Sequence, residues 1–564
     1  MTDDVLAAKG IFTDMSTSNE ESNEQYVPLF RIEDNILIGT EETHPECTNI
    51  GELVLDRLRN KLDFVGQLEI PSGKETTYAE MRERSIKCAL WLRKNGIQKG
   101  DKIGIWTDNH IDTYIPVFAS LYVAAVICPW DYEVSKGTAR YGLSLTSPKM
   151  VFVDAKSVEN LMEAAKEENL EVKVVVIGNL PGFVSLTDIL QDQVVQSEID
   201  EFRCTTVNNP HDTAMICPSS GTTGMPKGTE LSYVSLYNSI TPIEEVNMIN
   251  EVLLSISTIR WHCGLCLMFE LIMSNAKCVI IPDEYFQEKE TAEICKIIQD
   301  YKVTWFGCDI SFPSRLLKYN ILQEYPMSSL KKLVITGGPF TKKTQEAIAK
   351  MMPHTQILNC YGLTDAGGLC ASQAKNSKPG SCGFVTKGIQ IKVIDEKTDK
   401  ALGPNKSGEL CIKSEFIMKG YHKNLEETKN AIDSNGWLHT KDIAYYDEAG
   451  EIYFISRISD FINYNGCKIS PTAIEGILEI HPSVFNAAVV PVPHETDIEH
   501  PMAFIEKVIG KEVTEEELHN LVDNHLPNYY KLRGGIKFIN KLPRVSTGKI
   551  DRKQLKLLAK NNVN

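Results

Sequence analysis

Ser219-Ser220-Gly221-Thr222-Thr223-Gly224-Met225-Pro226-Lys227-Gly228 places three glycines, four hydroxyl side chains and one lysine within ten residues. The run follows an apolar segment, residues 213–217, which predicts the end of a strand. Glycine lets the backbone approach a ligand closely, and exposed backbone N–H groups form nests that hold phosphate. The spacing is not that of a Walker A loop, because no glycine directly precedes a Lys-Ser or Lys-Thr pair. We therefore predict a phosphate-binding loop of another kind, with a polar surface turn as the simpler alternative.

Three further motifs follow this run in order: NCYGLTD at 359–365, GWLHTKD at 436–442 and PRVSTGK at 543–549. Together the four motifs resemble those of the adenylate-forming superfamily, which includes acyl-CoA synthetases, 4-coumarate–CoA ligases, insect luciferases and peptide-synthetase adenylation domains. The resemblance extends from about Gly51 to the C-terminus. Within the superfamily, the sequence most resembles the insect luciferase-like acyl-CoA synthetases.

The composition is that of a soluble globular protein, with 42% hydrophobic and 24% charged residues. A net charge of −16 argues against binding to nucleic acid or to an anionic membrane. No signal peptide or membrane span is visible, because the longest uncharged stretch, residues 114–130, is short and contains two prolines. The chain ends without a Ser-Lys-Leu peroxisomal address. We expect a cytoplasmic protein that is a monomer or a weak homo-oligomer.

Short β-branched runs alternate with helical patterns from Gly51 onward, which predicts an α/β fold with doubly wound sheets. Residues 1–45 are acidic and rich in Ser, Thr and Asn, so we expect them to be mostly disordered. A break near residues 456–460 predicts a boundary between two domains. We expect a large AMP-binding body at 46–456 and a small mobile α+β lid at 457–564, an architecture that the resemblance also implies.

The resemblance implies a reaction in two steps. A carboxylate attacks the α-phosphate of ATP to give an acyl-adenylate and pyrophosphate, and the acyl group then passes to coenzyme A. This chemistry needs positioning, a metal and positive charge where negative charge develops. The expected ligands are ATP, Mg²⁺, coenzyme A and a fatty or aromatic carboxylic acid.

The resemblance also implies roles for individual residues, according to their positions in the motifs. The loop would hold the β- and γ-phosphates, Tyr361 would pack on adenine, and Thr364 would contact the α-phosphate. Lys549 would bridge the α-phosphate and the substrate carboxylate, and His262 would orient that carboxylate. The expected nucleotide-binding set is Ser219, Ser220, Gly221, Thr222, Thr223, Gly224, Lys227, Gly337, Gly338, Tyr361, Gly362, Thr364, Asp442, Arg457 and Lys549.

Asp442 and Arg457 resemble the pair that contacts the ribose, and a carboxylate suits that role because it offers two acceptor oxygens. Asp365 stands where the family usually has a glutamate that helps to hold Mg²⁺. Aspartate is still a hard oxygen ligand, although it is one methylene shorter.

Several positions near the lid depart from the family pattern. The expected hinge residue, usually Asp or Lys, is Ser459, and the lysine that serves the second half-reaction in related branches is Asn463. Lys441 and Cys360 each replace a usual glycine. We therefore hypothesise that adenylation is retained while transfer to CoA is slower or altered. Two alternatives stay open: a luciferase-like monooxygenase that oxidises the adenylate, and a nucleotide-binding pseudoenzyme.

Overall fold

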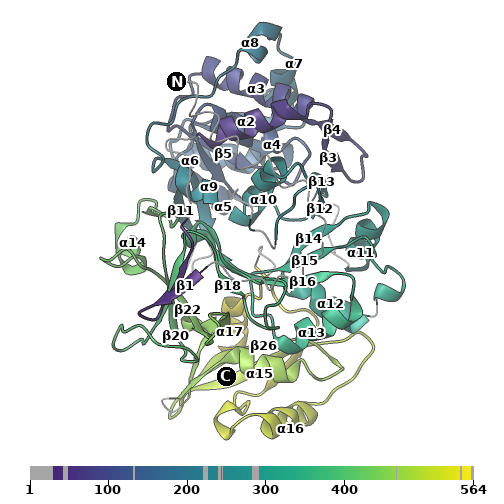
Figure 1. Ribbon diagram of the computed structural model, residues 1–564, viewed down its shortest axis with the longest axis vertical. Helices are drawn as coiled ribbons and strands as arrows, with labels where there is room; N and C mark the ends of the chain where they lie inside the picture. Colours follow the sequence, from purple (N-terminus) through teal and green to yellow (C-terminus); the bar gives the residue numbers. More distant parts are fainter. Residues whose placement is uncertain are drawn as a thin grey trace.

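The structure is a computed structural model of the 564-residue chain. It describes residues 30–41, 49–130, 134–219, 226–238, 243, 246–282, 291–319, 321–464, 467–545 and 549–560. Four sheets organise the described residues, three in a large body and one in a small C-terminal lid that lies below the body in Figure 1. This confirms an α/β fold with a multi-sheet body and a small α+β domain.

An eight-stranded sheet forms the upper part of the body (Figure 1). Its central strands are parallel, and they are continuous apolar runs because helices cover both faces. In spatial order its strands are β21 (Gly420–Tyr421), β11 (Lys227–Ser232), β10 (Thr213–Ser219), β6 (Val126–Pro129), β5 (Lys102–Trp106), β7 (Met150–Asp154), β8 (Lys173–Ile177) and β9 (Val184–Ser185). The helices of this region are α2 (Ile50–Asn60), α3 (Tyr78–Lys94), α4 (Tyr114–Tyr122), α5 (Lys136–Thr146), α6 (Val158–Glu167), α7 (Leu186–Gln191), α8 (Gln196–Asp200) and α9 (Tyr233–Asn238).

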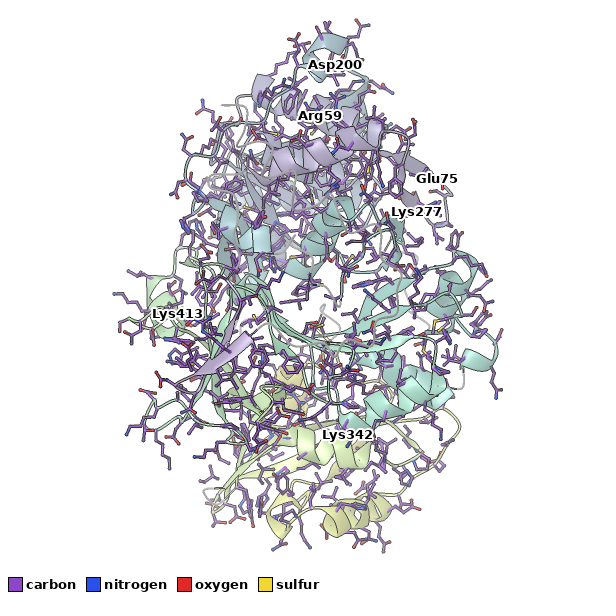
Figure 2. All side chains as sticks on the ribbon, viewed as in Figure 1. Arg59, Glu75, Asp200, Lys277, Lys342 and Lys413 are labelled. Carbon is purple, nitrogen blue, oxygen red and sulfur yellow. The ribbon has the colours of Figure 1, made fainter. Side chains whose placement is uncertain are left out.

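A nine-stranded sheet forms the second part of the body, and its strands from β13 to β16 are also parallel. An ion pair of 2.8 Å between Lys277 and Glu75 ties β13 to the edge strand β4, where Figure 2 labels both residues. The strands are, in order, β18 (Phe384–Val385), β17 (Gly368–Ser372), β16 (Gln356–Leu363), β15 (Lys332–Ile335), β14 (Trp305–Cys308), β12 (Val252–Ser255), β13 (Lys277–Ile280), β3 (Val65–Glu69) and β4 (Glu75–Thr77). Its helices are α10 (His262–Met273), α11 (Thr291–Asp300), α12 (Ser311–Tyr319) and α13 (Lys342–Met351).

A six-stranded antiparallel sheet completes the body, and α14 (Leu425–Ala431) packs beside it. It consists of β1 (Phe30–Glu33), β2 (Ile36–Gly39), β19 (Gln390–Ile394), β20 (Gly408–Lys413), β22 (Leu438–Tyr446) and β23 (Ile452–Arg457). The expectation of disorder for residues 1–45 is wrong for 30–39, because β1 and β2 form a hairpin that extends this sheet. Leu37 is fully buried there, so an apolar side chain anchors the segment despite its polar surroundings. Residues 1–29 and 42–48 lie outside the described residues.

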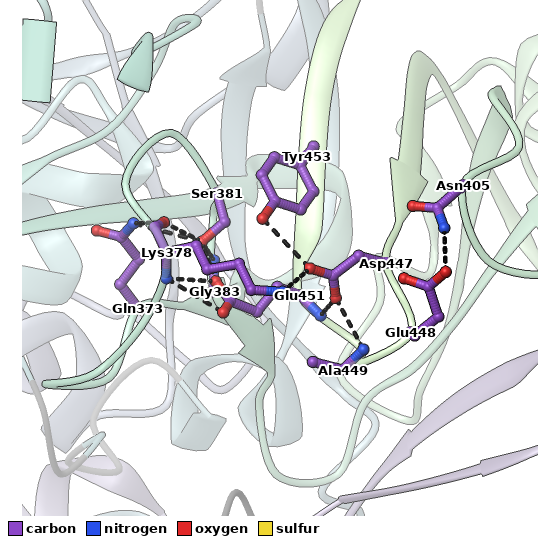
Figure 3. Close-up of polar contacts among 10 residues, drawn as sticks. All are labelled: Gln373, Lys378, Ser381, Gly383, Asn405, Asp447, Glu448, Ala449, Glu451 and Tyr453. Carbon is purple, nitrogen blue, oxygen red and sulfur yellow. Dashed lines mark hydrogen bonds and ion pairs between the residues drawn. The ribbon is translucent and has the colours of Figure 1, made fainter. Parts of the chain in front are cut away.

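The turn between β22 and β23 is held by a polar network, which Figure 3 shows. Lys378 Nζ pairs with Asp447, and the Lys378 backbone N–H donates to Glu451 Oε2 at 2.9 Å. The Ser381 hydroxyl also donates to Glu451, whose pKa is raised by burial. This network fixes the register of the two strands that carry Asp442 and Arg457.

The lid begins after β23, through a 3₁₀ turn at Ile458–Asp460 that contains Ser459. Its sheet contains β25 (Cys467–Ile469), β24 (Ile462–Tyr464), β27 (Ile498–Lys507) and β26 (Val484–His494), with β28 (Ile536–Ile539) paired to β27. Its helices are α15 (Pro471–Leu478), α16 (Glu515–His525) and α17 (Arg552–Lys560). The predicted boundary at 456/457 therefore falls at the last residues of a body strand.

A lysine joins the body to the lid. The Lys318 ammonium on α12 donates to the backbone carbonyls of Val484 and Phe485 on β26. Burial lowers the pKa of Lys318 to about 8. The Phe485 ring also contacts Tyr319, with ring centroids 5.3 Å apart. These contacts hold the lid against the nine-stranded sheet.

The longest uncharged stretch of the sequence, residues 114–130, forms helix α4 and strand β6. In the described part of the chain, no helix is both long and apolar enough to cross a membrane.

Candidate active site

A cavity of about 1170 Å³ lies between the body and the lid. Its wall includes the ends of β10 and β11, one face of α10, the end of β16, residues of β22 and β23, and Lys549 from the lid. The ends of strands from different sheets therefore meet at one place, as ligand sites in α/β folds commonly do.

The predicted phosphate loop connects β10 to β11. Ser219 and Lys227 are antiparallel partners at the mouth of this hairpin, and both line the cavity. The Lys227 ammonium pairs with the Glu427 carboxylate and lies 4.6 Å from the centre of the Tyr421 ring. The pairing with Lys227 lowers the pKa of Glu427. The loop residues between the two strands, Ser220, Gly221, Thr222, Thr223 and Gly224, lie outside the described residues.

Asp365 lies just beyond β16, in a short 3₁₀ turn that begins at Thr364. Its two carboxylate oxygens accept hydrogen bonds from the Thr229 hydroxyl at 2.9 Å and from the Tyr421 hydroxyl at 2.5 Å. Burial raises the pKa of Asp365, while these two hydrogen bonds and the nearby Lys227 lower it. Thr364 and Asp365 both line the cavity, so the predicted hydroxyl and carboxylate face the same space.

Gly362 and Gly337 are glycines for steric reasons. A Cβ at Gly362 would lie 2.5 Å from the Gly368 carbonyl oxygen, which is far inside contact distance. Gly337 has φ +88°, in the left-handed region that favours glycine. Both line the cavity, whereas Gly338 is absent from its wall and faces Ile310. The predicted glycine turn therefore contributes its first residue to the cavity.

Asp442 is buried in β22, directly opposite Arg457 of the neighbouring strand β23. Its Oδ2 atom accepts a hydrogen bond from the Tyr361 hydroxyl at 2.8 Å, and Arg457 Nε lies 3.2 Å from its Oδ1 atom. Oδ1 is nevertheless buried without a well-directed hydrogen bond among the described residues. Burial raises the pKa of Asp442, and Arg457 opposes that rise. One acceptor oxygen is thus held beside a cation behind the cavity wall, since Asp442 is absent from the cavity lining, whereas Arg457 is part of it.

Tyr361 is buried behind the cavity wall. Its ring stacks on Phe454 with centroids 6.4 Å apart, and its neighbours Cys360 and Gly362 reach the cavity. The Tyr361 hydroxyl donates a hydrogen bond to the Asp442 carboxylate and thereby orients it. A contact between the Tyr361 ring and adenine stays a prediction.

Lys549 reaches the cavity from the lid, and its backbone carbonyl accepts a hydrogen bond from the Val545 N–H at 2.9 Å. Its Cε atom would lie 3.7 Å from a Cβ on Gly337. Burial and the like charge of Arg457 lower the pKa of the Lys549 ammonium, while Asp442 and Asp309 raise it. The lid lysine and the body residues Asp442 and Arg457 therefore share one electrostatic environment.

His262 is the first residue of α10 and lines the cavity while being almost completely buried. Its Nε2 atom lies 3.4 Å from Cys266 Sγ. Burial lowers the pKa of His262 to about 4, so its imidazole is neutral at physiological pH. A neutral imidazole can donate a hydrogen bond to a carboxylate without carrying a charge.

Lys441 has φ +59°, in the left-handed region that favours glycine, which fits the expectation that a glycine is usual at this position. Its side chain lines the cavity and contributes to the lowered pKa of Glu427. Ser459 lies in the turn between the last body strand and the first lid strand, and Asn463 is exposed on β24.

Several cavity residues were not predicted from the sequence. Glu427 and Tyr421, which hold Lys227 and Asp365, carry no motif of their own. Glu270 on α10 also lines the cavity. A single acidic residue in an otherwise uncharged twelve-residue helix was the available signal for Glu270.

Comparison with known proteins places these features in one family. The family model of AMP-binding enzymes matches residues 57–422, and that of the AMP-binding enzyme C-terminal domain matches residues 473–549. The chain is 28% identical over 534 residues to a luciferin 4-monooxygenase of Photuris pensylvanica, covering 93% of this chain and 97% of that protein. It is 29% identical over 497 residues to a 4-coumarate–CoA ligase of Humulus lupulus, covering 86% of this chain and 89% of the ligase.

Among solved structures, ATP-bound MatB from Rhodopseudomonas palustris superimposes with a TM-score of 0.82 at 22% identity. The match covers 92% of this chain and all (100%) of the MatB chain, and it supports the two-part fold.

Proposed function

Since this chain belongs to the AMP-binding enzyme family, we propose that it is an adenylate-forming acid–thiol ligase. It activates a carboxylic acid with ATP and transfers the acyl group to coenzyme A. The observation that supports this most strongly is the position of Lys549. This lid lysine lines the cavity beside Gly337 and interacts electrostatically with Asp442, which is buried behind the cavity wall.

At the nucleotide end, Asp442 and Arg457 hold the ribose. Asp442 Oδ1 accepts a hydrogen bond from a ribose hydroxyl there, because it is buried beside Arg457 without a well-directed bond from the described residues. Ser219, Lys227 and the residues between them bind the phosphate chain, and Thr364 contacts the α-phosphate. Lys227 exchanges its Glu427 partner for a phosphate oxygen when the nucleotide binds.

At the reacting centre, one oxygen of the substrate carboxylate attacks the α-phosphorus, and the bond from that phosphorus to the pyrophosphate oxygen breaks. Lys549 stabilises the negative charge on the α-phosphate and the carboxylate in the transition state. His262 orients the carboxylate with a neutral N–H donor. Water is excluded because the lid closes the cavity over these groups.

Asp365 fits a Mg²⁺ site, since it offers hard carboxylate oxygens on the cavity wall. Each oxygen accepts one hydrogen bond and keeps lone pairs for a metal or its water ligands. The metal would neutralise charge on the phosphates, and Thr229 and Tyr421 hold the carboxylate in place.

The second step requires the lid to turn about the segment that contains Ser459, so that a CoA thiol attacks the acyl carbon and AMP leaves. Asn463 stands where related enzymes carry a lysine for this step. We propose that adenylation is retained and that thioester formation is slower than in relatives with that lysine.

The test is release of pyrophosphate by the purified protein with Mg-ATP and a panel of fatty and aromatic acids, with and without CoA. The proposal predicts acid-dependent release and acyl-CoA detectable by mass spectrometry. Adenylate without acyl-CoA would place the defect in the second step and favour oxidation of the adenylate instead. Absence of release despite ATP binding would contradict the proposal and favour a pseudoenzyme.

A further inference from the structure

The α10 helix presents a polar stripe to the cavity. His262, Cys266 and Glu270 follow each other at intervals of four residues, so they lie on one face of the helix. All three line the same cavity. At 1.5 Å per residue, the stripe extends about 12 Å from His262 to Glu270.

Glu270 lies at the far end of this stripe in an apolar environment. Val246, Met248 and Trp305 line the cavity and form one apolar cluster with Leu267 and Leu271 of α10, which lie on either side of Glu270 in the sequence. Trp305 already donates its indole N–H to the Val246 carbonyl at 3.0 Å, so it has no donor left for Glu270.

The Glu270 carboxyl lacks a full set of partners. Its Oε1 atom is buried without a hydrogen-bond partner among the described residues. Lys332 is close enough to influence its charge, and the Lys332 ammonium donates to the Asn247 carbonyl at 3.2 Å. Burial raises the pKa of Glu270 to about 8. A buried carboxyl without a donor is costly, and it is retained where a ligand supplies the missing bond.

We propose that Glu270 recognises the distal end of the substrate, and that the physiological acid carries a hydroxyl or amine group there. The inference rests on the proposed function, since the carboxylate of the acid is placed beside His262 and Lys549. The chain of the acid then runs along α10, past Cys266, and its donor group reaches the Glu270 carboxyl.

A site of this kind discriminates strongly between acids that carry the donor group and acids that lack it. An enzyme that hydrogen-bonds a buried polar group of its substrate rejects the analogue without that group, because a buried partner is then left unpaired. The unsubstituted acid should therefore be the poorer substrate, although it is more apolar and the pocket walls are apolar.

The experiment compares octanoate, ω-hydroxyoctanoate and ω-amino-octanoate with the wild type, Glu270→Gln and Glu270→Leu. The readouts are kcat/KM for pyrophosphate release and, without turnover, the dissociation constant of each acid by calorimetry. Hexanoate and decanoate analogues test the length of the stripe. Met268→Leu, a change of similar volume on another face of α10, is the matched control.

The wild type and the control are expected to prefer at least one ω-substituted acid over octanoate by tenfold or more. Glu270→Leu is expected to remove this preference by improving use of octanoate, and the better of the two substituents identifies the donor. Equal preference in the wild type and Glu270→Leu would overturn the proposal. If no acid is turned over, the proposed function fails separately, and the calorimetric preference still decides whether Glu270 recognises a donor.

Discussion

The two ends of the central cavity differ in how their charged groups are partnered. At the nucleotide end, Lys227 pairs with Glu427 and Arg457 lies beside Asp442. At the acyl end, Glu270 has a buried oxygen without a partner among the described residues. Each end therefore leaves one carboxylate oxygen without a hydrogen bond from the described residues, Asp442 Oδ1 and Glu270 Oε1, but Arg457 Nε lies 3.2 Å from the first. Under the proposed function, the protein supplies counter-charges where the polyphosphate common to all substrates binds. The oxygen that lacks such a partner lies where the acid varies, which is where specificity has to come from.

Lys549→Ala tests the nucleotide end most severely. The substitution removes the lid cation that faces Asp442 and Gly337, so charge in the adenylation transition state loses a fixed partner. We expect acid-dependent ATP–pyrophosphate exchange to fall about 100-fold or more, the scale of losing one preorganised donor. Lys560→Ala, at the exposed end of α17, should exchange at the wild-type rate. Undiminished exchange in Lys549→Ala would separate this lysine from the chemistry.

Asp442→Ala tests the ribose pair. It removes the acceptor for the Tyr361 hydroxyl and the counter-charge of Arg457, and with them the proposed acceptor for the ribose. Charged hydrogen bonds contribute about 1.5–3 kcal/mol, so the dissociation constant of ATP should rise roughly 10- to 100-fold. Calorimetric titration measures it, with Glu396→Ala in an exposed turn as the control. Unchanged ATP affinity would show that the ribose binds elsewhere.

Glu270→Gln tests the acyl end through stability. Burial raises the pKa of Glu270 to about 8 in the folded protein, so the folded state holds the proton more tightly than the unfolded chain does. The wild type therefore loses stability as the pH rises from about 5 to 8, and the glutamine variant is spared this loss.

We compare the unfolding free energy of Glu270→Gln with that of the wild type at each pH, measured by urea unfolding. This difference should favour the variant more at pH 8 than at pH 5, by on the order of 2 kcal/mol. Glu346→Gln, an exposed glutamate on α13, should show the same difference from the wild type at both pH values. An equal effect of Glu270→Gln at the two pH values would mean that this carboxyl is not desolvated.

Lys441→Gly is expected to have the smallest effect. Lys441 is in the left-handed region with φ +59°, where a side chain is strained and glycine is not. We expect glycine to stabilise the protein by about 0.5–1 kcal/mol in urea unfolding. Lys441→Ala keeps the strain and is the matched control. If alanine and glycine stabilise equally, the effect belongs to the lysine charge and not to the backbone.

The residues of the proposed nucleotide end lie in contiguous motifs, so their local structure is readable from the sequence. Strand β10 ends at Ser219 before the loop, Asp442 pairs with Arg457, and Lys549 lines the cavity. The roles of these residues in binding and catalysis stay predictions. The partners of these residues were not predicted. Glu427 and Tyr421 come from a separate segment, and only folding brings them to Lys227 and Asp365.

The acyl end and the N-terminal strands were harder to predict for the same reason. Glu270 is a single charge in an apolar helix, and its meaning depends on which face of α10 the cavity touches. Residues 30–39 were grouped with the acidic, polar segment before them, although half of them are large apolar residues, and the pairing of β2 with β19 supplies backbone bonds and a place for Leu37. Long-range pairing of this kind leaves little signal in local composition.

A crystal structure of the protein with ω-amino-octanoyl sulfamoyl-adenosine, a stable analogue of the acyl-adenylate, would show whether the nucleotide and the acyl chain bind at the two proposed ends of the cavity. We expect the ribose hydroxyls on Asp442, the sulfamoyl linker beside Lys549, and the amine at the Glu270 carboxyl. An analogue bound outside this cavity, or one whose acyl chain turns away from α10, would contradict this expectation.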